Sequence, residues 1–352
     1  MVAFGSAADI QCIIERRQAE VGIKKEKMNK QEIRDIVREQ LRNSRLQFPE
    51  SIDLREEDQN ITLFLDGGAV KNMQDDAAAF EGWILGVKAA MDKAKRGYTY
   101  TLDWHRTPSQ SGHYQRFLYR VQKFDALFGG RTGWFRIKNP AWLNDLMING
   151  GENEAYLLNA PQVAEERLND SDDSIENFLE NQIVKQQNDT GGLGAMFGMP
   201  LARQLPVGLF RSAVKKKNII FTGGKSAVDI WGVRKGAGKG PGELYLFELK
   251  AKGNRKAGVL SELFFYAMVL RDEQDGRFVR RADANAEIAP EGKMIRGTKC
   301  LKAIVLAPEI HPILTEDTFR LLNEALERRE MKFGFVQMDY VMEPRFQFQE
   351  RW

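Results

Sequence analysis

Cysteine and histidine are scarce in this 352-residue chain, which has two cysteines and three histidines. Cys12 and Cys300 are far apart and form no CxxC motif, which excludes a disulfide-stapled scaffold and a cysteine-rich zinc site and favours a reducing, cytoplasmic compartment. The histidines are too scattered for an HExxH metal site. A metal bound here would therefore be held by carboxylates, which favours magnesium, manganese or calcium over zinc.

Long apolar runs are also missing. No stretch approaches the roughly 18 to 20 residues that span a bilayer, and the longest candidate, residues 263–270, fits one face of a short buried helix. The first residues lack the basic stretch followed by an apolar stretch that marks a secretory signal. We therefore expect a protein with no membrane partner.

The net charge of +3 is small but unevenly distributed. Residues 211–256 contain twelve Lys and Arg against three Asp and Glu, whereas residues 161–190 contain two Lys and Arg against eight Asp and Glu. A basic block around a few isolated carboxylates is typical of a site that handles a polyanion. For a charge run taken alone, a solvated surface without a ligand is the alternative.

Hydrophobic periodicity predicts an α/β protein with two units. The polar, acidic stretch 150–173 is the expected boundary, so that an N-terminal α/β or α+β unit (1–160) precedes a second unit (161–352). In the first unit we expect strands at 61–66, 98–104 and 134–138 and helices at 30–43, 77–95 and 113–128. In the second we expect helices at 174–186, 258–270 and 316–329, a glycine-rich loop at 191–199, and strands at 203–210, 218–221, 226–233, 243–250, 301–306 and 333–339.

The two strands around residues 236–242 contain the residues on which a function can be argued. The turn-rich segment between them suits a hairpin loop. Symmetrical pairing about this loop gives partner numbers that sum to about 477, which places Asp229 opposite Glu248 with Cβ atoms about 5 Å apart. Lys250 lies on the same face because side chains alternate along a strand. We expect this charged face to look into solvent, with apolar neighbours on the other face. A register one residue different would separate the carboxylates.

This set of residue types suits phosphodiester chemistry. A divalent cation held by Asp229 and Glu248 would polarise a phosphate and lower the pKa of bound water. Lys250, kept charged by the carboxylates beside it, would stabilise an attacking hydroxide or the charge that develops on the phosphoryl group.

Asp229, followed after a hairpin by Glu248-Leu249-Lys250 and then by an amphipathic helix, resembles the PD-(D/E)XK nuclease superfamily. The resemblance covers roughly residues 171–307. It implies a restriction-endonuclease-like core, a mixed β-sheet flanked by helices in the order helix, three-stranded meander, helix, strand. It also implies an endonuclease or exonuclease that depends on Mg²⁺ or Mn²⁺, with DNA as the expected substrate. Val228 stands where the motif often has proline.

The resemblance implies further site residues. Many members place a glutamate on the first core helix to complete the metal shell, and Glu176 is the expected residue here, with Glu180 as the second choice. Many members also have a Gln-x-x-x-Tyr pattern on the helix after the motif. Glu262 and Tyr266 have this spacing, with glutamate in place of glutamine, and are candidates for a supporting role.

The remaining expectations concern ligands and partners. We expect phosphate contacts from five basic residues of the block: Lys215, Lys216, Lys217, Arg255 and Lys256. The first unit would recognise substrate, regulate the site, or bind a second copy or a protein partner, in restriction, defence against foreign DNA or repair. Two alternatives stay open: a non-catalytic nucleic-acid-binding module that retains the fold, and a structural or partner-binding protein in which the charged residues form only an ion-pair network.

Overall fold

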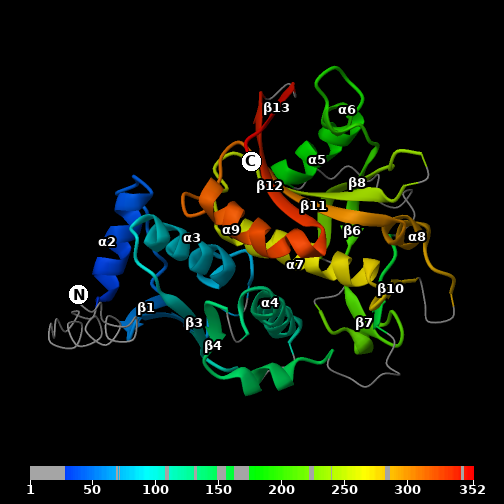
Figure 1. Ribbon diagram of the computed structural model, residues 1–352. Helices are drawn as coiled ribbons and strands as arrows, with labels where there is room; N and C mark the ends of the chain where they lie inside the picture. Colours follow the sequence, from blue (N-terminus) through cyan, green and yellow to red (C-terminus); the bar gives the residue numbers. More distant parts are fainter. Residues whose placement is uncertain are drawn as a thin grey trace, which may run out of the picture.

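The computed structural model is a mixed α/β fold in which three β-sheets are flanked by helices (Figure 1). It describes residues 28–68, 70, 72–107, 111–130, 133–148, 156–161, 174–221, 226–238, 240–281, 286–341 and 345–352. Most of the predicted boundary, including residues 162–173, lies outside these ranges. Among the described helices, none has the length and apolar character needed to cross a membrane.

The first sheet is built by the N-terminal half in the order β1-β2-β3-β4. Its strands are β1 (Ile52–Glu57), β2 (Asn60–Leu65), β3 (Thr99–Trp104) and β4 (Phe135–Ile137). β1 is antiparallel to β2, whereas β2, β3 and β4 are parallel. Parallel neighbours need crossover helices, and these are α3 (Phe80–Lys93) and α4 (Gly112–Phe128), while α2 (Lys30–Gln40) packs against α3.

The largest sheet has the order β13-β12-β11-β9-β8-β6. Its strands are β6 (Leu201–Pro206), β8 (Ala227–Arg234), β9 (Gly242–Leu249), β11 (Thr298–Ala307), β12 (Met331–Tyr340) and β13 (Phe346–Glu350). β6, β8 and β9 are antiparallel neighbours, and β9, β11 and β12 are parallel. The helices are α5 (Ile175–Lys185) before the sheet and the crossovers α7 (Gly258–Gln274) and α9 (Glu316–Leu326). Helix, meander, helix and strand therefore follow one another in the order that the resemblance implied.

The third sheet joins the two halves of the chain. Its order is β10-β5-β7, formed by β10 (Phe278–Arg280), β5 (Tyr156–Leu158) and β7 (Leu209–Arg211). β5 belongs to the first predicted unit and pairs on both sides with strands of the second. The predicted boundary near residue 160 therefore does not coincide with a break in the strand pairing.

Several local expectations were wrong. The glycine-rich segment 191–199 contains a short helix, α6 (Leu193–Phe197). The strand expected at 203–210 is divided into β6 and β7, which lie in different sheets. The division follows Pro206, which has no N–H to continue a ladder. Residues 218–221 form no strand and contribute only the isolated bridge between Phe210 and Ile219. The very short strands β5 and β10 were not expected.

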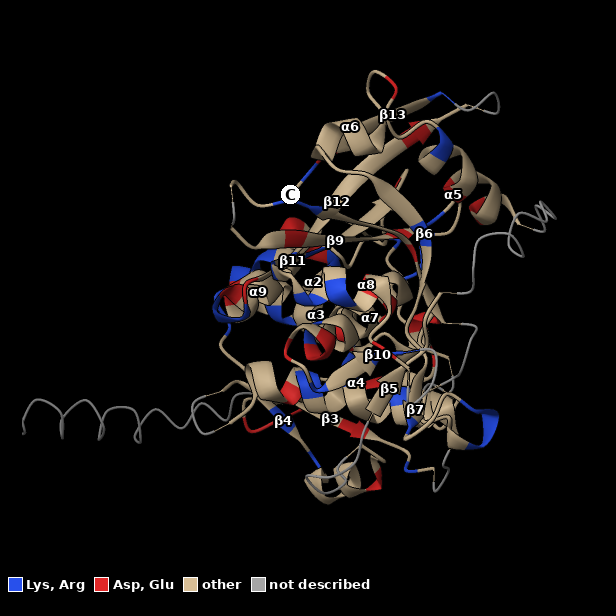
Figure 2. Cartoon of the chain, turned by 90° about the vertical axis from the view of Figure 1, so that its right-hand side faces the viewer, with Lys and Arg blue, Asp and Glu red and all other residues tan. Residues whose placement is uncertain are grey.

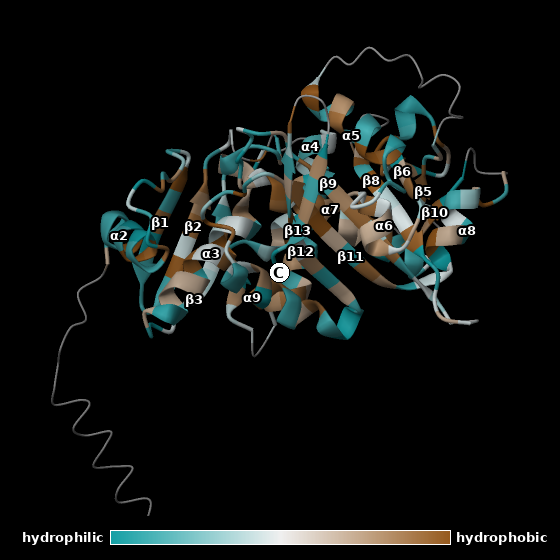
Figure 3. Cartoon of the chain, turned by 90° about the horizontal axis from the view of Figure 1, so that it is seen from above, coloured by the Kyte–Doolittle hydropathy of each residue, from teal (hydrophilic) through white to brown (hydrophobic). Residues whose placement is uncertain are grey.

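A single main hydrophobic core extends through both halves. It contains apolar residues of β2, β3, α3 and α4 together with most of α7 and parts of β9, β11 and α9. In Figure 3 the hydrophobic colour accordingly runs along β9 and α7 as well as along the N-terminal strands. A second, smaller core lies on the other face of the large sheet, under α5 and α6. The two predicted units are therefore packed as one body around α7.

Buried charges reinforce this packing between α7 and the N-terminal half. Arg120 of α4 forms two hydrogen bonds with Glu81 of α3, with Nη2–Oε2 at 2.6 Å and Nε–Oε1 at 2.7 Å. Ser261 of α7 donates to the same Glu81 carboxylate at 2.6 Å. Lys123 and Tyr119 of α4 both donate to Asp272 near the end of α7. α7 is thus bonded to the N-terminal half near both of its ends.

Replacing Arg120 with alanine should lower the free energy of unfolding by about 3–5 kcal/mol, because Glu81 would stay buried without its cation. Urea denaturation followed by circular dichroism measures the loss. The control is Arg320→Ala, which removes an exposed cation from Asp317 and Glu324 and should cost less than about 1 kcal/mol. Because the core is shared, both halves should unfold in one transition. Two separate transitions would contradict the shared core.

Candidate active site

The β8–β9 hairpin has the predicted register. Ile230 pairs with Phe247 and Trp231 with Leu246, so the partner numbers sum to 477. The regular ladder ends at Ile230 and Phe247, which leaves Asp229 and Glu248 level with each other just beyond it. There the Asp229 side chain replaces a strand contact, because its Oδ2 accepts a hydrogen bond from the backbone N–H of Leu249 at 2.8 Å. Asp229 therefore sits at the point where the two strands separate.

The expected division into a charged face and an apolar face needs a correction at Asp229. Phe247 and Leu249 pack in the smaller core, as does Ile230, but Val228 packs in the main core. The alternation of β8 is thus interrupted at Asp229. The interruption coincides with a break in the other ladder, because β6 pairs with the residues before and after Asp229 but not with Asp229 itself.

The charged face is buried under α7 and does not look into solvent, contrary to expectation. Glu248 is 1% exposed and Lys250 is 9% exposed, while Asp229 is partly exposed. The Lys250 ammonium lies 2.7 Å from Glu248 Oε1 and 3.1 Å from Glu262 Oε2 of α7. One buried cation is therefore shared between two carboxylates from different elements.

Glu262 is held by two further donors. The Tyr266 hydroxyl, one turn along α7, donates to Glu262 Oε1 at 3.2 Å, so the spacing seen in the sequence corresponds to a direct contact. The Gln74 side-chain amide, from the N-terminal half, donates to the same oxygen at 2.6 Å. Arg116 of α4 is a second buried N-terminal residue whose charge acts on Glu262 and Tyr266. Sequence reasoning named neither Gln74 nor Arg116, because both are more than a hundred residues away along the chain.

The ionisation of the cluster is uneven. Burial raises the pKa of Glu248 well above its usual range, with repulsion from Asp229 and Glu262 adding to the shift and Lys250 opposing it. Burial likewise raises the pKa of Asp229, against the pull of Lys250. For Glu262, burial is outweighed by Lys250 and the donors around it, so its pKa is lowered. For Lys250, burial is outweighed by the three carboxylates, so its pKa is raised.

The first core helix brings Glu180, not Glu176, next to the cluster. Glu180 is 2% exposed, and its charge is among those that raise the pKa of Asp229. It accepts hydrogen bonds from Arg203 at 3.2 Å and from Gln204 at 2.7 Å, both of β6. Glu176 instead accepts from the Ala251 N–H at 3.2 Å and from Asn254 at 3.0 Å, and so pins the loop after β9.

The carboxylates around Lys250 are the candidate ligands of a divalent cation. Among the described residues, no three His, Cys, Asp or Glu side chains are gathered so as to hold a metal ion. The expected trio of Asp229, Glu248 and Glu176 is therefore not assembled. Glu248 Oε2, however, is buried and accepts no hydrogen bond, and the charge of Asp229 acts on Glu248. Mg²⁺ is often held by only one or two carboxylates, with water and substrate phosphate completing its shell, so the pair Asp229 and Glu248 fits such an ion.

The five basic residues do not form one surface. Lys215, Lys216 and Lys217 are exposed in the loop after β7 (blue beside β7 in Figure 2), where β7 belongs to the same sheet as β10 at the C-terminal end of α7. Arg255 and Lys256 lie just before the other end of α7 and are paired with Glu309 and Asp75. The two groups are therefore associated with opposite ends of α7, a helix of 17 residues that is roughly 25 Å long.

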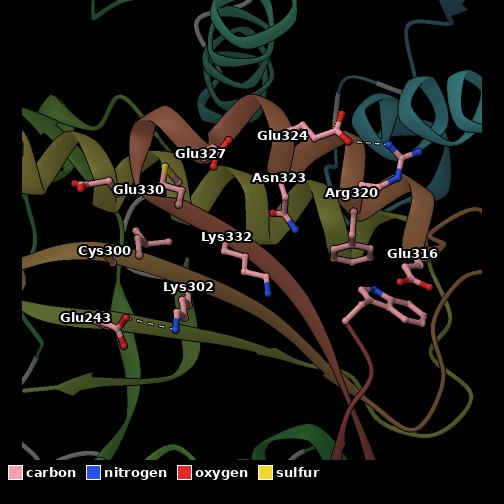
Figure 4. A pocket seen from close by; sticks show the side chains of 14 residues that line it. Glu243, Cys300, Lys302, Glu316, Arg320, Asn323, Glu324, Glu327, Glu330 and Lys332 are labelled. Carbon is pink, nitrogen blue, oxygen red and sulfur yellow. Dashed lines mark hydrogen bonds and ion pairs between the residues drawn. The ribbon is translucent and has the colours of Figure 1, made fainter.

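A pocket beside α9 is not part of this site. It has a volume of about 660 Å³ and lies between α9 and the first residues of β9, β11 and β12 (Figure 4). Its charged residues are partly paired with one another, as in Glu243 with Lys302 and Arg320 with Glu324. Glu243 lies near the start of β9, whereas Lys250 directly follows its last residue, which corresponds to roughly 23 Å along the extended chain.

Comparison of the chain with protein-family models, curated protein sequences and solved structures gives no match in any of the three. The case for a function therefore rests on the fold and on the geometry of the cluster around Lys250.

Replacing Glu248 with glutamine should stabilise the metal-free protein more as the pH rises. The folded-state pKa of Glu248 lies well above the ordinary value of 4.5. Below about pH 4.5, Glu248 is protonated in both the folded and the unfolded chain, and the folded state keeps its full stability. As the pH rises from there through the raised folded-state pKa, that stability is lost. Glutamine resembles the protonated form at every pH, so the variant and the wild type should melt together at about pH 4. At about pH 8 the variant should melt several degrees higher. Thermal scans with a chelator measure the difference, and a difference independent of pH would contradict a protonated Glu248.

Proposed function

We propose that this protein is a metal-dependent nuclease of the PD-(D/E)XK type. The observation that carries the proposal is an excess of carboxylate around one cation. Glu248 and Glu262 share the Lys250 ammonium, the charge of Asp229 acts on Glu248 and Lys250, and Glu248 Oε2 accepts no hydrogen bond. Protons compensate this excess in the metal-free protein, and a divalent cation is the natural replacement for them. The order of α5, β6, β8, β9, α7 and β11 supports the same class.

The side chains have distinct tasks in this proposal. Asp229 and Glu248 would hold Mg²⁺ or Mn²⁺, which supplies a polarised phosphate and a water of lowered pKa. Lys250 stays protonated between Glu248 and Glu262 and presents a fixed positive charge to the reacting phosphoryl group. Glu262 and Tyr266 hold the ammonium in place from α7. Glu180 supplies negative charge behind Asp229.

A purely structural ion-pair network explains the cluster less well. A buried network that only stabilises the fold is expected to satisfy its charges, because each unpaired buried charge is costly. Here the pKa values of two carboxyls are pushed far above their usual range while a third is lowered, on three adjacent strands and helices. Groups whose environments push their pKa values apart are typical of catalytic sites.

The arrangement of basic residues suits an extended substrate. DNA is the proposed polymer, on the strength of the resemblance. Arg255 and Lys256 lie just before α7, and Lys215 to Lys217 lie in the loop after β7, whose sheet includes β10 after the other end of α7. A duplex rises 3.4 Å per base pair, so roughly seven base pairs match the length of α7. A cytoplasmic role in restriction, defence against foreign DNA or repair is the proposed setting.

Lys250→Ala and Asp229→Asn should each reduce cleavage by about a thousandfold or more, because each removes a charge that acts on the reacting phosphate. Lys250→Ala also leaves Glu248 and Glu262 buried without their shared cation and should lower the stability of the metal-free protein, so circular dichroism verifies that each variant is folded at the assay temperature. Asparagine is chosen at Asp229 so that the Leu249 N–H keeps an acceptor. Cleavage of linear, supercoiled, single-stranded and branched DNA and of RNA, each with Mg²⁺ and with Mn²⁺, measures the effect. Lys252→Ala, which changes an exposed lysine two residues further on, is the control and should remain active. A wild-type protein that cuts none of these substrates and binds no divalent cation by calorimetry would favour a binding module instead.

Reversing the charge of Lys215, Lys216 and Lys217 to glutamate should weaken binding to duplexes longer than about ten base pairs. The slope of log affinity against log salt should fall by about 0.9 for each phosphate that the variant no longer neutralises. Fluorescence anisotropy without Mg²⁺ measures both quantities. The matched control reverses three exposed cations on the α9 side, Arg320, Arg328 and Lys332, for the same change in net charge. Equal losses in the two triple variants would mean that only the overall charge matters.

A further inference from the structure

The segment just before α3 is clasped to the start of α7, next to the candidate site. Three consecutive residues of the N-terminal half each bond to a different part of this region. The Gln74 amide donates to Glu262, Asp75 accepts from Lys256 at 3.1 Å, and Asp76 accepts from the Ala257 N–H at 2.5 Å. Asp76 thereby binds an N–H group at the N-terminus of α7 that has no partner within the helix.

The backbones of the two segments also meet. A Cβ atom added to Gly258 would collide with the carbonyl oxygen of Gln74, so the first residue of α7 must be glycine for this approach. The segment is fixed from its other side as well, because the Ala78 carbonyl accepts from the buried Arg120 at 2.7 Å. Gln74 is therefore presented by a short stretch of chain that is anchored on both sides.

The position of the Gln74 amide divides the two oxygens of Glu262 between different partners. Oε1 accepts from Gln74 and from Tyr266, and Oε2 is left to face the Lys250 ammonium. A carboxylate that is free to turn about its last bond would offer either oxygen to the lysine. Held at Oε1, it keeps Oε2 toward Lys250.

We propose that Gln74 is a positioning residue for the Lys250–Glu262 pair, and that the candidate site is complete only when the N-terminal half is docked on α7. The inference rests on the proposed nuclease function for its catalytic consequence, but the positioning itself is a property of the metal-free chain. On this view the N-terminal half contributes directly to the active site, in addition to any part it takes in recognition.

A charge-swap cycle tests the proposal through activity. Gln74→Glu places a second carboxylate against Glu262 Oε1 and should lower kcat about tenfold or more, with KM changed less than about twofold, because alignment is lost and binding is not. In a background of Glu262→Gln, the same change restores a hydrogen bond with donor and acceptor exchanged, so its penalty should shrink to less than about twofold. Asp92→Asn, which removes an exposed ion pair with Lys88 on α3, is the control and should leave kcat unchanged. Equal penalties in both backgrounds would overturn the proposal.

A second readout does not depend on cleavage. Lys250 can be labelled with an amine-reactive acetylating reagent and the rate followed by mass spectrometry, with circular dichroism to verify folding. Gln74→Ala should speed the labelling of Lys250 about threefold or more relative to wild type, because a less firmly held Glu262 stabilises the charged, unreactive ammonium less. Asp92→Asn should not change it. Unchanged labelling in Gln74→Ala would overturn the positioning role even if the protein is a nuclease. Faster labelling in a protein that cuts no nucleic acid would support the positioning role and reject the proposed function.

Discussion

Helix α7 is buried on all sides, and the rest of the structure depends on satisfying its polar residues. A helix surrounded by core must give every charged side chain a partner inside the protein. The four polar residues concerned receive these partners from different elements. Ser261 bonds to Glu81 of α3, Glu262 to Lys250 of the loop after β9, Asp272 to Lys123 of α4, and Glu273 to Arg280 of β10. Each bond fixes another layer of the protein against the helix, so the two halves have little freedom to pack differently.

The bond between Glu262 and Lys250 is part of the candidate site. The residues of the site that are close in sequence could be predicted, and the contacts from distant segments could not. The register of β8 and β9 could be predicted because it is a local property, set by the turn and by the alternation of side chains along two neighbouring strands. It located Asp229, Glu248 and Lys250 relative to one another. The spacing of Glu262 and Tyr266 was also informative, because residues four apart on a helix meet on one face. What lies opposite that face is set by tertiary packing, and a contact such as that from Gln74, 188 residues away, leaves no periodic signal.

The confusion between Glu176 and Glu180 has the same origin. The two residues are one helical turn apart and lie on the same face of α5, so periodicity does not show which of them is closer to the site. That depends on the position of α5 along the sheet. Arg203 and Gln204 of β6 bond to Glu180 and so place it, rather than Glu176, near Asp229. The expected domain boundary does not coincide with a break in the packing, for a related reason. An acidic, polar stretch marks a surface segment, but it does not show whether the cores on its two sides are separate, and here they are continuous.

Asp229 combines a structural role with the proposed role as a metal ligand. Asp229 closes the gap where β8 and β9 part, through its bond to the Leu249 N–H, and the same side chain is the proposed metal ligand. A descendant that lost the proposed activity would leave the Leu249 N–H unsatisfied if an apolar residue replaced Asp229. In descendants that no longer have the proposed activity, the aspartate, or an asparagine in its place, should therefore persist as a trace of the former site.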